Sequence, residues 1–197
     1  MHMNTFRNIC FVGMPAVGKS YIGRQIAKKR LMTFVDTDKI IINKYKMKLL
    51  NNRYNKKFLK LEDDPITSLN LKTLDDNSDY LNNNYVFSPG GSAIYNDESI
   101  NYFKSNLKCR VYYLHISFDE YKERVCDKLT ERGVVSASIP YHNISVDSAL
   151  KYIYEERLDL YYKNADSIIN VEDKEGSFER VYEHINDDYP SNLYRNC

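Results

Sequence analysis

Five short apolar runs along the chain have the composition of buried β-strands: residues 9–12, 32–35, 85–87, 111–116 and 167–171. Between them, apolar residues recur every three to four positions, which is the period of an α-helix with one buried face. These helical segments cover residues 20–30, 37–48, 54–64, 97–105, 118–129, 145–164 and 177–186. The alternation of strands and helices predicts an α/β fold with a parallel sheet flanked by helices.

Two regions interrupt this alternation. Residues 65–84 are polar and rich in Asn and Asp, with leucines spaced as in one further helix. Residues 130–144 contain small residues and Pro140 and have no clear period, which predicts a mobile lid. The last eleven residues, 187–197, have the character of a loosely held tail. We therefore expect a single domain over residues 1–186.

Composition excludes several classes of protein. The chain has 197 residues, enough for one domain with a proper core, and its 28 basic and 27 acidic residues nearly cancel. Such a balance argues against a nucleic-acid or membrane partner. Apolar runs are far shorter than the roughly 20 residues of a membrane span. Four scattered cysteines indicate free thiols rather than a zinc site or disulfides. We expect a cytoplasmic protein.

The candidate chemistry begins directly after the first predicted strand. Residues 13–20 read G-M-P-A-V-G-K-S, a complete phosphate-binding loop, or Walker A motif, placed between a strand and a helix. Glycines in such a loop let backbone N–H groups surround phosphates, while the lysine adds a cation and the serine hydroxyl ligates Mg²⁺. The predicted nucleotide-binding residues are Gly13, Ala16, Val17, Gly18, Lys19 and Ser20.

Two further groups follow strands at the edge of the sheet where ligands bind in open parallel sheets. Asp36 and Asp38 come after the second predicted strand, and Gly90 and Gly91 come after the third. The carboxylates are suited to a metal-bound water and an acceptor hydroxyl, and the glycines allow a substrate to approach the backbone. The alternative interpretation is that one aspartate only caps a helix and the glycines only form a turn.

Taken together, these features resemble the shikimate kinase family of small P-loop kinases. The resemblance covers nearly all of residues 7–185. It includes the loop, the Asp-x-Asp pair, the glycine turn, Arg124 and Arg132, and a motif built from Arg157, Tyr161, Ala165 and Asp166. It implies a three-layer fold with five parallel strands in the order 2-3-1-4-5. It also implies ATP with Mg²⁺ as cofactors and transfer of the γ-phosphate to a hydroxyl of a small carboxylic acid.

The resemblance also implies roles for single residues. Lys19 would contact the β- and γ-phosphates, Ser20 and Asp36 would hold Mg²⁺, and Asp38 would bind and deprotonate the acceptor hydroxyl. Arg132 would reach from the lid to the transferring phosphate.

The remaining implied roles concern two further arginines and the acceptor site. Arg124 would pack on adenine, and an exposed helix position is the alternative for it. Arg157 would pair with the acceptor carboxylate, with Gly90 and Gly91 as a wall of the acceptor site. The acceptor region would lie at about 37–80.

Departures from the family pattern leave the acceptor open. Ala16 replaces a loop glycine, Ser92 replaces the third glycine of the turn, and Leu59 stands where the family has a carboxylate-binding arginine. Losing such a contact costs about 1.5 to 3 kcal/mol. Lys60 and Arg53 are candidate replacements. The alternatives are a kinase for another small alcohol, such as a gluconate-like acceptor or a nucleoside monophosphate, and an inactive ATP-binding regulatory module. Sequence leaves a monomer and a weak homo-oligomer equally open.

Overall fold

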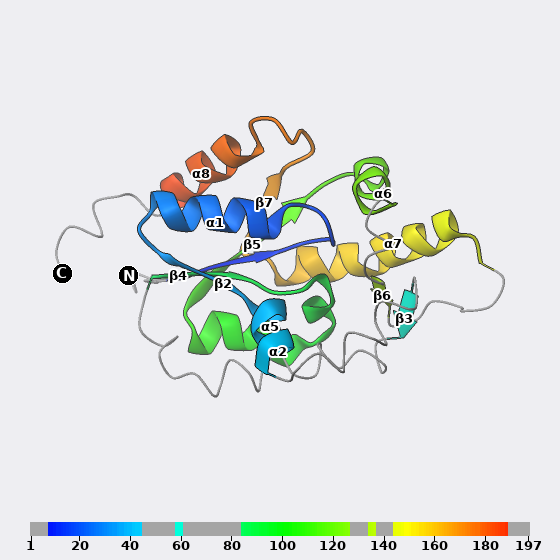
Figure 1. The fold of residues 1–197 in the computed structure, drawn as a ribbon, viewed down its shortest axis with the longest axis horizontal. Helices are drawn as coiled ribbons and strands as arrows, with labels where there is room; N and C mark the ends of the chain where they lie inside the picture. Colours follow the sequence, from blue (N-terminus) through cyan, green and yellow to red (C-terminus); the bar gives the residue numbers. More distant parts are fainter. Residues whose placement is uncertain (1–7, 45–57, 61–83, 127–133, 137–143, 189–197) are drawn as a thin grey trace.

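The computed structural model of the chain describes residues 8–44, 58–60, 84–126, 134–136 and 144–188. Its centre is a five-stranded sheet in the order β2-β4-β1-β5-β7, and every neighbouring pair of strands is parallel (Figure 1). Counted along the chain, this is the predicted order 2-3-1-4-5, which is therefore confirmed. The strands are β1 (Asn8–Val12), β2 (Thr33–Asp36), β4 (Tyr85–Ser88), β5 (Cys109–His115) and β7 (Ser167–Asn170).

Helices cover both faces of this sheet, as Figure 1 shows. One face carries α1 (Lys19–Lys29) and α8 (Ser177–Asp188), which contact each other. The other carries α7 (Val146–Asn164) and α5 (Asp97–Asn101), the latter extended by a π-helical segment, η4 (Tyr102–Asn106). The remaining helical segments are α2 (Thr37–Lys44), the 3₁₀ helix η3 (Gly91–Tyr95) and α6 (Phe118–Cys126). None of the helices in the described ranges is long and apolar enough to cross a membrane.

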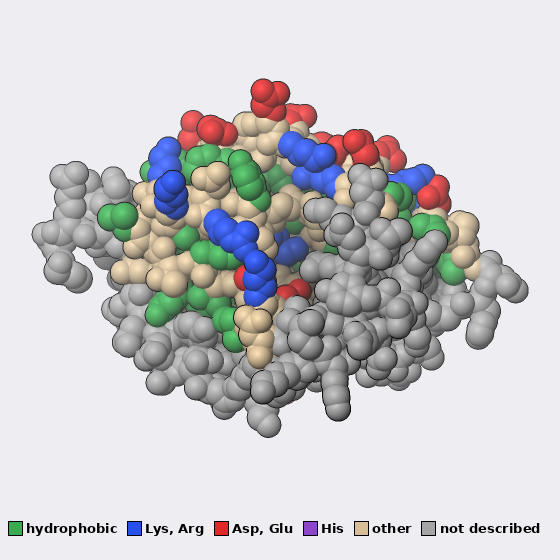
Figure 2. Space-filling view, viewed as in Figure 1, with side chains coloured by type: hydrophobic (Ala, Val, Ile, Leu, Met, Phe, Trp, Pro, Cys, Tyr) green, Lys and Arg blue, Asp and Glu red, His purple; other side chains and the backbone are tan. Residues whose placement is uncertain are grey.

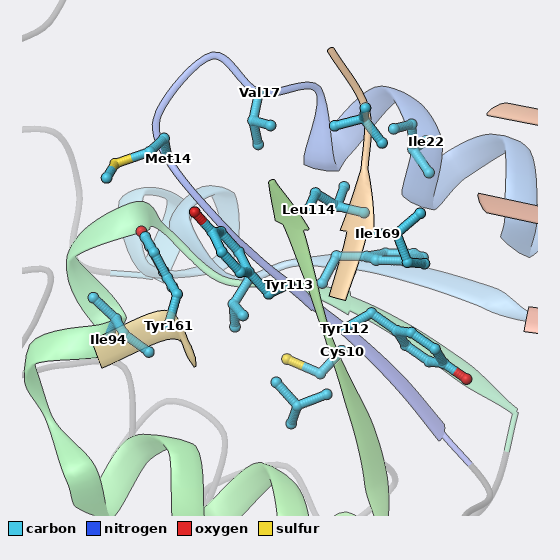
Figure 3. Close-up of a cluster of buried hydrophobic side chains, with 14 of the residues drawn as sticks. Cys10, Met14, Val17, Ile22, Ile94, Tyr112, Tyr113, Leu114, Tyr161 and Ile169 are labelled. Atoms are coloured by element: carbon cyan, nitrogen blue, oxygen red, sulfur yellow. The ribbon is translucent and has the colours of Figure 1, made fainter. Parts of the chain in front are cut away.

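The core is built on the central strands. All five residues of β1 are buried, as expected for a strand covered by helices on both faces. Tyr113 of β5 stacks on Tyr161 of α7 with ring centroids 4.8 Å apart, and Figure 3 shows the two rings side by side. Tyr112 donates its hydroxyl to Asp188 of α8 at 2.8 Å. The tyrosine-rich β5 thus joins the helical layers on the two faces of the sheet.

One predicted helix is wrong. Within the segment 54–64, residues 58–60 form a strand, β3 (Phe58–Lys60), which pairs in parallel with β6 (Val134–Ser136). Leu59 is opposite Val135 in this two-stranded sheet. A short apolar run does not distinguish helix from strand by its period, and here pairing with a distant segment decides. The same pairing gives regular structure to residues 134–136, inside the segment predicted as a lid.

Other boundaries differ by a few residues, and α8 ends at Asp188 rather than at residue 186. The Asp188 carboxylate accepts the Tyr112 hydroxyl and pairs with Arg110 at 3.0 Å, which holds the last turn in place. The further helix predicted within 65–84 lies outside the described residues, apart from residue 84. So do most of the predicted lid and the tail from residue 189 on.

Candidate active site

The loop between β1 and α1 has the shape of a phosphate cradle. Gly13 and Gly18 have φ angles of 151° and 105°. A Cβ at Gly13 would lie 2.7 Å from the carbonyl oxygen of Leu114, so the close approach of loop and β5 requires glycine. Helix α1 begins without a side-chain cap and without acidic residues in its first turn. Its first N–H groups and the positive end of its dipole therefore suit an anion.

The Lys19 side chain lies over this loop. It is largely buried and donates hydrogen bonds from Nζ to the carbonyl oxygens of Gly13 at 2.8 Å and Met14 at 2.9 Å. Ala16 has a φ of 64°, in the left-handed region. The backbone at this position has a conformation that favours glycine. Alanine adopts it at a cost of about 1 to 2 kcal/mol in conformational energy.

Three oxygen atoms meet at the start of α1. The Ser20 hydroxyl donates to Oδ2 of Asp36 at 3.2 Å and lies 3.4 Å from the Ser88 hydroxyl oxygen. Asp36 and Ser88 are paired residues at the ends of β2 and β4, which places their side chains at one edge of the sheet. Oxygen ligands with one carboxylate fit Mg²⁺, which keeps several waters and takes further oxygens from phosphates. The donor set therefore fits the ion that the phosphate loop implies.

The two aspartates have different surroundings. Oδ1 of Asp36 accepts the backbone N–H of Lys39 at 3.3 Å, so Asp36 does cap α2 as well as meeting Ser20. Asp38 is 7% exposed and packs against Gly90. A Cβ at Gly90 would lie only 2.5 Å from Oδ1 of Asp38. Glycine at this position is what allows the Asp38 carboxylate to occupy its place.

The next glycine borders the arginine of α7. Arg157 is 1% exposed, and its Nη1 lies 2.9 Å from where a Cβ of Gly91 would be. The hydroxyl of Tyr161 donates to the Gly91 carbonyl at 3.0 Å, which ties this turn to α7. Successive glycines thus make room for a carboxylate and for a guanidinium.

A cavity of about 380 Å³ opens beside the loop, and Lys19, Ser20, Asp36, Asp38 and Gly90 all line it. Figure 2 shows basic and acidic side chains meeting in the middle of this face of the molecule. The structure therefore brings the predicted phosphate, metal and acceptor residues of the first three strands together. Arg157 lies behind Gly91 and is not among the lining residues.

Arg124 is buried rather than an exposed helix residue, so that alternative is wrong. Its guanidinium donates to the carbonyl oxygen of Val17 at 3.2 Å and to that of Val171 at 3.0 Å, and it also contacts the carbonyl of Glu172. Glu120, one turn earlier on α6, pairs with its Nε. Arg124 thus connects the phosphate loop to the segment after β7.

Several predicted residues lie outside what the structure describes. Arg132 and Arg53 fall in undescribed ranges, and for Leu59 and Lys60 only the backbone of β3 is described. Sequence reasoning missed Ser88 and Val134, which also line the cavity. The strand-end rule already used for Asp36 would have found Ser88, because it is the last residue of β4. Val134 had no such signal, since its strand was not predicted.

Comparison with known proteins gives a consistent result. The family model described as SKI, shikimate kinase, matches residues 15–188. The shikimate kinase of Bacillus pumilus is 31% identical over 159 residues, which cover 79% of this chain and 76% of that protein. The shikimate kinase of Oceanobacillus iheyensis is 28% identical over 158 residues, with coverage of 79% and 76%.

Solved structures share the fold. The structure of shikimate kinase from Acinetobacter baumannii in complex with shikimate matches with a TM-score of 0.68 at 22% identity, covering 98% of this chain and 97% of that one. The structure from Aquifex aeolicus matches with a TM-score of 0.66 at 21% identity, covering 92% and 97%. These likenesses show a shared fold.

Proposed function

This chain belongs to the shikimate kinase family of ATP-dependent phosphotransferases, and from that premise we propose that it transfers the γ-phosphoryl group of ATP to a hydroxyl of shikimate. The observation that carries the proposal is the pair of adjacent glycines, one against Asp38 and one against Arg157, beside the phosphate loop. This arrangement places a carboxylate suited to a hydroxyl and a guanidinium suited to a carboxylate against neighbouring residues of one turn.

The residues of the loop bind and orient the triphosphate in this proposal. Backbone N–H groups of the loop and the ammonium of Lys19 neutralise the phosphate oxygens. Ser20 and Asp36 hold Mg²⁺, with Ser88 beside them. When bound, the ion supplies positive charge to the phosphates during transfer.

Asp38 acts on the acceptor. Its carboxylate accepts the proton of the attacking hydroxyl, which makes that oxygen a better nucleophile toward the phosphoryl group. Burial around Asp38 limits competing attack by water. Arg157 pairs with the acceptor carboxylate, because a planar guanidinium suits bidentate contact with that group.

Leu59 bears on which acid is accepted. Its place in β3 is fixed by pairing with Val135 of β6. With leucine at this position, Arg157 carries the carboxylate contact without the family's second arginine. We expect acceptor affinity to be ten- to a hundredfold weaker than with both cations.

The remaining parts of the proposal concern the whole chain. Residues 1–186 form a single domain, with an acceptor region at about 37–80 and a lid at about 130–144 that brings Arg132 to the transferring phosphate. Arg124 packs on adenine. The protein works in the cytoplasm as a monomer or weak homo-oligomer, with a small acid as partner and no nucleic acid.

The test is ADP release that depends on shikimate. Wild-type protein with ATP and Mg²⁺ should release ADP on addition of shikimate, and Asp38→Asn should lower kcat by about a hundredfold or more. Asp119→Asn, at an exposed position of α6, is the matched control and should retain wild-type rates. ATP binding without turnover of shikimate, gluconate, homoserine or nucleoside monophosphates would instead indicate a nucleotide-binding regulatory module.

A further inference from the structure

A polar cluster connects β6 to the buried arginine of α7. The Ser136 hydroxyl donates to Oε2 of Glu156 at 2.8 Å. The Glu156 carboxylate lies near enough to the Tyr95 hydroxyl to help raise its pKa. That hydroxyl in turn accepts the Nε–H of Arg157 at 3.1 Å. Helix α7 thus contacts β6 through Glu156 and η3 through Arg157.

Tyr95 holds Arg157 by its ring as well as by its hydroxyl. The guanidinium carbon of Arg157 lies 5.0 Å from the ring centroid, within the range of a cation–π contact. On another side, Nη1 lies 2.9 Å from where a Cβ of Gly91 would be. Gly91 and Tyr95 are the first and last residues of η3, so the guanidinium lies beside both ends of this 3₁₀ helix.

The phenol is suited to join two charged groups. Burial raises the pKa of Tyr95, so the hydroxyl keeps its proton at neutral pH. It accepts the Nε–H of Arg157 and keeps a proton on the side of the Glu156 carboxylate. Because the contact with Arg157 is made at Nε, it fixes the direction in which the two Nη atoms point, and these form the edge suited to a carboxylate.

We propose that Tyr95 is a positioning residue that aims Arg157 at the acceptor carboxylate and so contributes to acceptor specificity. The inference rests on the proposed function, in which Arg157 binds that carboxylate. Arginine side chains carry about 2 kcal/mol of rotamer entropy, so a guanidinium held before the substrate arrives binds it more tightly.

The kinetic test is Tyr95→Phe, which keeps the ring under the guanidinium and removes the hydroxyl that accepts the Arg157 Nε–H. We expect the KM for shikimate to rise about tenfold while the KM for ATP stays within about twofold. Tyr121→Phe is the matched control, because Tyr121 is fully buried and its hydroxyl has no hydrogen-bond partner among the described residues. An unchanged KM for shikimate in Tyr95→Phe would overturn the proposal.

A pair of competitive ligands separates positioning from a general loss of structure. Tyr95→Phe should weaken inhibition by a shikimate analogue that retains the carboxylate, and leave inhibition by the corresponding carboxamide unchanged. Equal weakening of both ligands, with a lower thermal midpoint, would show that Tyr95 serves only the fold. Glu156→Gln, which keeps a partner for the tyrosine hydroxyl but removes the charge, should shift the KM in the same direction by a smaller factor.

The position of Arg157 can also be tested without any acceptor. In the nuclear magnetic resonance spectrum, the Arg157 Nε–H should exchange slowly in wild type and in Tyr121→Phe, and faster in Tyr95→Phe. Equal exchange rates in wild type and Tyr95→Phe would overturn the inference. This readout does not depend on turnover, so it remains decisive even if shikimate is not phosphorylated and the proposed function fails.

Discussion

At the scale of single residues, the two glycines of the turn after β4 have separate tasks. A Cβ at Gly90 would lie 2.5 Å from Asp38, whereas one at Gly91 would lie 2.9 Å from Arg157. Each glycine therefore leaves space for a different side chain, although the two glycines are neighbours in sequence. The distinction becomes testable because one added methyl group perturbs one partner at a time.

We expect Gly90→Ala to lower kcat by about a hundredfold, because displacement of a catalytic group by about 1 Å has an effect of that size. Gly91→Ala should mainly raise the KM for shikimate, since its methyl group meets Arg157. Steady-state kinetics with both substrates checks the pair, and thermal midpoints report on folding. If kcat falls and the KM for shikimate rises by the same factors in both variants, the two glycines do not act separately.

Sequence reasoning reached many of these residues for a physical reason. The spacing from Gly13 to Ser20 identifies a phosphate loop directly, and aspartates that follow strands are expected at the ligand-binding edge. Tyr95 was not reachable in this way. Its importance arises from contact with Arg157, 62 positions away, and no local pattern encodes that contact.

At the scale of elements, helix α1 is followed by a residue with a left-handed backbone conformation, Leu31. The N–H of Met32 donates to the carbonyl of Ala27 at 2.8 Å, closing the turn around Leu31, which has a φ of 54°. This is the geometry in which glycine commonly ends a helix. Leu31 is 92% exposed, so its side chain contributes little packing in return.

Leu31→Gly should therefore raise the free energy of unfolding by about 0.5 to 1 kcal/mol, after allowing for the greater entropy of glycine in the unfolded chain. Urea unfolding followed by circular dichroism measures the change. Leu31→Ala is the control, because it removes the exposed side chain and keeps the left-handed backbone cost. A Leu31→Gly variant no more stable than Leu31→Ala would contradict this account.

The elements themselves were largely predictable. The five strands of the main sheet carry continuous apolar runs, and the helices between them are long enough for their period to be read. β3 was missed because three residues cannot establish a period, and because its partner β6 lies far along the chain. Non-local pairing of short strands is the kind of information that a local pattern lacks.

At the scale of the whole molecule, Arg124 connects parts that are distant in sequence. From its place on α6, it bonds to the phosphate loop at Val17 and to the segment after β7 at Val171. Removing its side chain would leave buried carbonyl oxygens without these donors, which costs about 1 to 3 kcal/mol for each unsatisfied group.

We expect Arg124→Ala to lower the free energy of unfolding by at least about 2 kcal/mol and to raise the KM for ATP about tenfold, since the loop loses its support. Denaturant unfolding and steady-state kinetics check the two effects. Lys122→Ala, on the same helix as Arg124, removes an exposed ion pair with Asp147 of α7, and its effect on stability should be much smaller. Wild-type stability and ATP kinetics in Arg124→Ala would rule out this connecting role.

The pairing of β3 with β6 constrains how the two strands can evolve. Two strands that share a hydrogen-bond ladder cannot drift independently, since a shift of one by a single residue reverses which side chains face each way. Exchanging residues 58–60 for the equivalent piece of another family member should therefore succeed only when 134–136 is exchanged with it. The two strands are in this sense inherited as one unit.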